Sequence, residues 1–93
     1  RRGMIKVKGR NNLKCPKGHI LHGVSYLQKR WETMIEGIYC QVYKKSKEGT
    51  RKCYRREKEK RGGALRCGEN EDLVGLFRNK GKNTLGGLIC CIR

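Results

Sequence analysis

The sequence predicts an all-β fold, a small antiparallel β domain held together by disulfides. The chain has 93 residues, of which 35% are hydrophobic and 6% aromatic, so little apolar surface is available for a core. Its cysteines form an even set in a short chain, which is typical of a disulfide framework in an oxidising compartment: Cys15, Cys40, Cys53, Cys67, Cys90 and Cys91. Thirteen glycines separate short apolar runs, and no window shows sustained helical periodicity.

These apolar runs predict the strands. Residues 4–8 alternate between apolar and basic side chains, and residues 20–27 and 72–78 carry central glycines. Residues 38–43 and 88–92 are rich in residues that favour strands. Only residues 28–36 could form a helical turn. We therefore expect a compact β domain over residues 15–93, preceded by a mobile basic arm over residues 1–14.

The β domain contains an internal repeat. Aligning Cys15 with Cys67 places Leu21 on Leu73 and Gly23 on Gly75. Each unit opens with a cysteine, forms an apolar strand with a glycine, passes through a polar turn and returns on an apolar strand that closes in a cysteine. The pattern predicts two cysteine-closed loops, residues 15–40 and 67–91, joined by a basic connector over residues 41–66.

The repeat also predicts the disulfide pairing. If each unit is closed at its own base, Cys15 pairs with Cys40, and Cys67 pairs with Cys90 or Cys91. Cys53 then takes the remaining member of that adjacent pair. A direct bond between Cys90 and Cys91 is disfavoured because the ring that it would close is strained.

The positive charge is clustered. Of the net charge of +16, residues 1–14 carry +6 and residues 40–67 carry +8, while the other two segments carry +1 each. Clustered cations attract extended polyanions and anionic membranes. Residues 43–48 and 54–59 share the order x-B-B-x-B-x, where B is basic, which resembles the consensus for heparin-binding sites. The residues predicted to bind an anionic glycan are Lys44, Lys45, Lys47, Arg51, Lys52, Arg55, Arg56, Lys58, Lys60 and Arg61.

Other interpretations of these residues are a basic face without a ligand, a metal site and an enzyme. The cations could form a solvated basic face without a specific ligand. Cys15, His19 and His22 lie close enough in sequence to suggest a zinc site, but there is no Cys-x-x-Cys pair, and we expect no metal and no cofactor. Asp72 is the sole aspartate, and no paired carboxylates or nucleophile–base pattern occurs, so we expect no enzymatic activity.

The two units resemble the dermatopontin family. The matching positions are Cys15, Pro16, Gly18, Leu21, Gly23 and Cys40 in the first unit, and Cys67, Asn70, Leu73, Val74, Gly75, Cys90 and Cys91 in the last. Members of that family are secreted matrix proteins, with invertebrate relatives that act as lectins, haemagglutinins or cell-aggregation factors. The resemblance implies cell adhesion or carbohydrate recognition. This chain is more basic than those relatives, which indicates a preference for anions.

Together these features predict a secreted, extracellular binding module whose partner is an anionic polysaccharide or glycosaminoglycan, either heparin-like or on a microbial surface. The chain begins without methionine and has no apolar run of membrane-spanning length, so we expect a mature, soluble form. The alternative is a cationic antimicrobial or venom polypeptide that acts on an anionic membrane surface. Adventitious nucleic acid binding is expected from the same charges.

Overall fold

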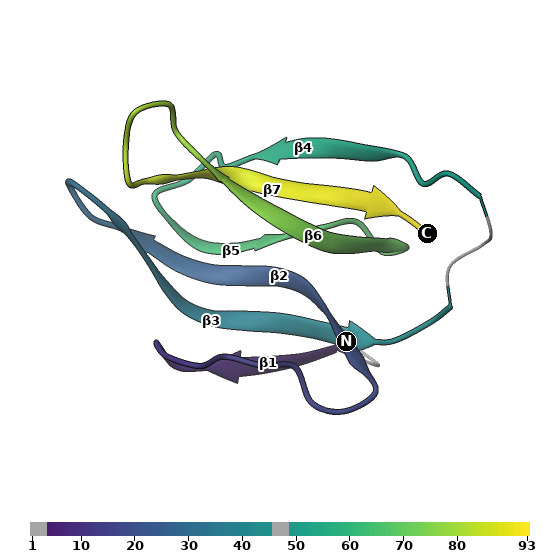
Figure 1. Ribbon diagram of the computed structural model, residues 1–93. Coiled ribbons are helices and arrows are strands. Elements are labelled where there is room, and N and C mark those ends of the chain that lie inside the picture. The colour runs from purple at the N-terminus through teal and green to yellow at the C-terminus, as the bar shows by residue number, and fades with distance from the viewer. Residues whose placement is uncertain (1–3, 46–48) are drawn as a thin grey trace.

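The computed structural model describes residues 4–45 and 49–93 and confirms the all-β prediction. The described residues form no helix but seven strands: β1 (Met4–Lys8), β2 (His19–Gln28), β3 (Thr33–Val42), β4 (Cys53–Glu57), β5 (Gly62–Arg66), β6 (Glu71–Arg78) and β7 (Leu85–Ile92). The strands make two antiparallel sheets, one in the order β1-β3-β2-β5 and the other in the order β4-β7-β6 (Figure 1). Within these two ranges there is accordingly no helix long and apolar enough to cross a bilayer.

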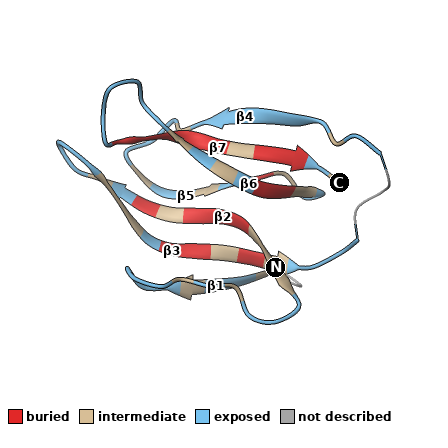
Figure 2. Cartoon of the chain, viewed as in Figure 1, coloured by how far each residue is buried: buried red, intermediate tan, exposed pale blue. Residues whose placement is uncertain are grey.

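The core lies between the two sheets, where β2 and β3 face β6 and β7. Figure 2 shows the buried residues concentrated on these strands, whereas β1, β4 and β5 are exposed or half-buried. Side chains alternate between the faces of a strand, so cross-strand partners such as Val24 and Ile38 bury the same face. The buried cluster consists of Val24, Tyr26, Ile38, Cys40, Cys67, Leu73, Leu85, Leu88 and Cys90.

The internal repeat folds as two equivalent hairpins, β2–β3 and β6–β7. Each hairpin has a bulge at the same place in the alignment, between Leu21 and Gly23 in the first and between Leu73 and Gly75 in the second. A second register shift follows in each unit, at equivalent positions nearer the tip. Bulges increase the local twist of a strand, so the two hairpins share their curvature as well as their sequence pattern. The sheets differ in size because β5 adds to β2 and no described strand adds to β6 in the same way.

The disulfides close the hairpins as the repeat predicts. Cys15 pairs with Cys40 and Cys67 with Cys90, each at the base of its hairpin. The structure resolves the choice between the two adjacent cysteines. Successive residues of β7 lie on opposite faces, so Cys90 faces the core while Cys91 lies on the other face, opposite Cys53 of β4, to which it is bonded.

The expectation of a mobile arm is wrong for residues 4–8. They form β1, which pairs with β3 at the edge of the four-stranded sheet. Val7 lies opposite Ile38 and packs against the buried cluster, so the alternating pattern has the usual meaning of a half-buried strand. Residues 1–3 lie outside the described ranges.

The connector and the suggested helical turn also differ from expectation. The connector contributes two strands, β4 and β5, and Leu65 of β5 packs against the core. Residues 28–36 form the tip of the β2–β3 hairpin and the start of β3 rather than a helical turn. Thr33 Oγ1 accepts a hydrogen bond of 2.8 Å from the backbone N–H of Leu85, and this bond to the neighbouring hairpin favours the extended conformation.

The burial of Cys67 and Cys90 predicts that their disulfide contributes more than the one between Cys53 and Cys91. The crosslinks join residues 38 and 23 positions apart, and each should stabilise the fold by roughly 3–4 kcal/mol through chain entropy, which depends only weakly on segment length. Replacing Cys67 and Cys90 by alanine also leaves a void in the core, at a further cost of about 1–2 kcal/mol. In the other pair Cys91 is buried but Cys53 is exposed, so the second contribution is smaller there.

Urea unfolding of the two double-alanine variants measures the difference. The variant without Cys67 and Cys90 should have the lower free energy of unfolding. A larger loss for the variant without Cys53 and Cys91, whose closed segment is the longer one, would show that loop length and not core packing decides the ranking.

Candidate functional site

Three loops meet at one end of the molecule, seen at the left of Figure 1. We call this the loop end and define it by residues 29–32, 58–61 and 78–83. A bridge between Glu32 and Asn83 joins the tips of the two hairpins. The N–H of Lys58 donates to Gly86 O at 2.8 Å, which ties the β4–β5 loop to the second hairpin. The N–H of Gln28 donates to Arg61 O and ties the same loop to the first hairpin.

The loop end is strongly cationic. Its lysines and arginines are Lys29, Arg30, Lys58, Lys60, Arg61, Arg78, Lys80 and Lys82. Its two acids are Glu32 and Glu59, and within the described ranges neither forms an ion pair with these cations. Seven of the eight cations are exposed, while Lys58 is half-buried and its Nζ donates to Gln28 Oε1. The charges are therefore available to a ligand in solution.

The loop end also contains the one tryptophan of the chain. Trp31 is 76% exposed, an unusual position for so large an apolar side chain. The guanidinium carbon of Arg30 is 5.1 Å from the centre of the Trp31 ring, within the range of a cation–π contact. An aromatic ring beside cations can stack on a sugar ring or on a base while the cations bind its charged substituents.

The structure does not bring the predicted glycan-binding residues together. Lys44 and Lys45 follow β3 at the end of the molecule opposite the loop end, and Lys52 precedes β4 on that side. Lys58, Lys60 and Arg61 belong to the loop end. The two groups are separated by β4, whose residues advance roughly 3.3 Å each. Lys47 lies outside the described residues.

The cations of β4 are divided between its faces. Arg55 lies opposite Ile89 and Arg56 opposite Leu88, on alternate sides of the sheet. The Arg55 guanidinium carbon is 4.4 Å from the ring centre of Phe77, and Arg56 donates to the Tyr54 hydroxyl at 3.4 Å. All five residues of β4 are exposed at the edge of a sheet. Charged side chains at such an edge hinder pairing with the edges of other molecules, so these arginines have a structural explanation.

Arg51 is part of a buried ion-pair network. Asp72 is 4% exposed, and its two oxygens accept hydrogen bonds from Arg51 Nη2 at 2.8 Å and from Arg93 Nε at 2.7 Å. Arg93 also donates to Gln41 Oε1 of the other sheet at 3.2 Å. A buried carboxylate requires such partners, so Arg51 stabilises the fold and is not free for a glycan.

A second aromatic–cation arrangement lies on the outer face of the four-stranded sheet. Tyr39 of β3 has Lys6 Nζ at 5.5 Å and the Arg66 guanidinium carbon at 5.3 Å from its ring centre. The Arg66 side chain reaches the ring by crossing Gly23, where a Cβ would lie only 2.5 Å from Arg66 Cγ. The cations of this face are thus already placed against an aromatic ring of the same chain.

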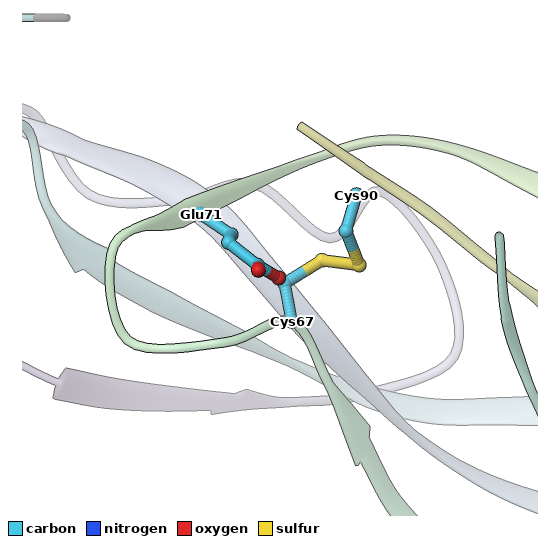
Figure 3. Close-up of side chains that lie close together, drawn as sticks. All are labelled: Cys67, Glu71 and Cys90. Carbon is cyan, nitrogen blue, oxygen red and sulfur yellow. A yellow bond between two sulfur atoms is a disulfide. The ribbon is translucent and has the colours of Figure 1, made fainter. Parts of the chain in front are cut away.

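Among the described residues, one group of side chains has the composition of a metal site, but its ligand atoms are already engaged in other bonds. Figure 3 shows this group, Cys67, Glu71 and Cys90. The two sulfurs are bonded to each other, and a metal requires thiolates. The Glu71 carboxylate accepts hydrogen bonds from the N–H of Gly68 at 2.7 Å and from the Tyr54 hydroxyl. These contacts fix the turn between β5 and β6.

The histidine-containing alternative does not form a site either. Cys15 is bonded to Cys40, so its sulfur is not a thiolate. His22 is 2% exposed and is the extra residue of the bulge in β2. Its Nδ1 donates to Glu71 O at 3.3 Å. Burial lowers the pKa of His22 below the ordinary histidine value, and the nearby Arg66 and Arg93 act in the same direction.

Two of the three loops were missed by the sequence reasoning. Residues 29–32 and 78–83 lie in segments with a net charge of only +1 each, because acids of the same segments offset their cations. In the second segment the acids lie at the start of β6 or just before it, at the end of the strand far from the hairpin tip: Glu69, Glu71 and Asp72. Counting charges over windows of hairpin-tip length would have found residues 78–83, which contain three cations and no acid.

Comparison of this chain with protein-family models, with curated proteins and with solved structures finds no match.

The buried His22 predicts a loss of stability in mild acid. Because its folded pKa is lowered, the unfolded chain takes up a proton first as the pH falls through about 6.5. The contribution of neutral, buried His22 to stability is therefore complete above about pH 6.5 and is lost as the pH falls from there towards the pKa of His22 in the folded chain. In the variant His22→Gln, whose amide can donate to Glu71 O, the melting temperature should change less between about pH 7.5 and pH 5 than in the parent. Equal changes in both proteins would mean that His22 does not titrate in this range.

Proposed function

We propose that the chain is a secreted, non-enzymatic module that binds anionic polysaccharides, such as heparin-like glycans or microbial surface polymers, through the loop end. The observation that carries this proposal is that three adjoining loops carry eight cations and the exposed Trp31. Three disulfides favour an extracellular location. The likeness of the two hairpin units to the dermatopontin family, which includes lectins, agrees with a glycan ligand.

Both parts of the loop end suit a charged polysaccharide. Exposed cations gain little from isolated surface ion pairs, but several of them on one surface create a potential that concentrates a polyanion. Arginine also binds sulfate and carboxylate groups through paired hydrogen bonds. Trp31 supplies the flat apolar surface on which a sugar ring can stack.

The composition of the loop end favours a glycan over a membrane. A peptide that lies in the membrane interface requires a wide apolar face opposite its cations. The three loops contain a single large hydrophobic residue, Trp31, which is too little for such a face. Release of dye from anionic vesicles at concentrations that saturate heparin binding would favour the membrane alternative.

Two charge variants test the proposal on a heparin column. One replaces Lys29, Arg30, Lys80 and Lys82 of the loop end by glutamine, and the other replaces Lys17, Lys44, Lys45 and Lys52 at the opposite end. All eight side chains are exposed and form no ion pair within the described ranges, so both variants should fold. The loop-end variant should elute at lower salt, and each lost ion contact should reduce the slope of log K against log salt by about one.

The two variants have the same net charge, so the comparison isolates position from total charge. The opposite-end variant should elute close to the parent. Elution of both variants at the same reduced salt concentration would show diffuse attraction to the whole surface and would refute a site at the loop end.

A further inference from the structure

We propose that the β6–β7 turn, residues 78–83, binds a single sulfate or phosphate ester group of a sugar whose ring lies against Trp31. This inference rests on the proposed function and specifies which chemical group of the ligand the loop end recognises. It separates a shaped site from a surface that merely attracts negative charge.

An open pocket without acids lies against the turn. It has a volume of about 460 Å³. Its lining is formed by residues 78–83 and consists of three cations, two asparagines and one glycine. Cationic groups and amide donors together are the chemistry that binds the oxygens of an oxyanion.

Hydrogen bonds fix the conformation of this turn. The N–H of Lys82 donates to Asn79 O at 3.0 Å across residues 80 and 81. Gly81 has a φ of 71°, as the third position of a type II turn requires. The Asn79 side chain donates to Thr84 Oγ1 at 2.8 Å, and Thr84 is buried. The backbone of the turn is therefore ordered by contacts of its own, which lowers the entropy cost of binding.

Arg78 is held at the edge of this pocket. Its Nη1 donates to Asn83 Oδ1 at 3.2 Å, a bond across the base of the turn. A guanidinium has five N–H donors, so this contact orients the group and leaves donors free for a ligand. Its planar fork matches two oxygens of a sulfate or phosphate group. Lys80 and Lys82 add charge on either side of Gly81.

The hairpin tip that carries Trp31 is joined to this turn. Glu32, the residue after Trp31, forms a bridge with Asn83, the last residue of the turn. The bond from Leu85 N to Thr33 Oγ1 holds the two tips in this position. A sugar that places its ester group in the turn would thus lie next to the hairpin tip that carries Trp31. Trp31 is also the one tryptophan of the chain, so its fluorescence reports on this contact alone.

Titration of the full chain with small sugars tests the inference. The probes are a sulfated heparin disaccharide, the same disaccharide without sulfate, and mannose 6-phosphate, followed by calorimetry and by Trp31 fluorescence. The sulfated disaccharide or the phosphorylated sugar should bind and change the fluorescence, and the stronger of the two identifies the ester. The unsulfated disaccharide should bind at least about tenfold more weakly.

Three variants show whether the turn is responsible. Replacing Arg78, Lys80 and Lys82 by glutamine should weaken binding of the preferred ester about tenfold or more. Replacing Lys29, Lys60 and Arg61 removes the same charge from the other two loops and should weaken it by less than about threefold. Asn83→Ala changes no charge but releases Arg78, and it should also weaken binding. Thermal unfolding checks that each variant is folded.

The outcomes distinguish the inference from the proposed function. Equal losses in the two charge variants, or full affinity in Asn83→Ala, would show that charge alone attracts the ligand and would refute a shaped ester site. Retention on heparin without binding of either ester sugar would refute the inference and leave the proposed function standing. Failure of the parent chain to bind heparin at physiological salt would refute the proposed function itself.

Discussion

The disulfides at the bases of the two hairpins are the constraint on which the fold depends. Three members of the buried cluster, Cys40, Cys67 and Cys90, are half-cystines, so covalent bonds occupy positions where a larger domain would place aliphatic side chains. With so few apolar residues, strand pairing alone would not offset the entropy of ordering the chain. The bonds restrict the unfolded chain and hold each hairpin in register.

This arrangement makes the two ends of the molecule different. All three disulfides and the Asp72 ion pairs lie where β3 and β7 end, and they stabilise that half of the sandwich. At the opposite end, backbone hydrogen bonds and the turn residues hold the three loops. Their long side chains are not needed for packing. The loop end can therefore carry many cations and an exposed tryptophan, which would be unfavourable near the core.

The features that could be predicted from the sequence are those that depend on local patterns of residues. The repeat identified both hairpins and the Cys15–Cys40 bond, because alternation and glycine positions are local signals. It did not choose between Cys90 and Cys91, since that choice requires knowing which face of the strand is buried. The cation clusters were located along the chain but not in space. Folding separates Lys44 from Lys60 and brings residues 29–32 next to residues 78–83, because the topology places distant loops side by side.

We propose the loop end as the ligand surface, in place of the cation cluster that the sequence predicts in the connector. Backbone amide chemical shifts, measured by NMR while a short heparin oligosaccharide is added at physiological salt, test it most directly. If the loop end binds the ligand, the largest shifts should fall on residues 29–32, 58–61 and 78–83 and on the Trp31 indole N–H. Shifts concentrated instead on Lys44, Lys45 and Lys52, or spread evenly over the exposed cations, would contradict it.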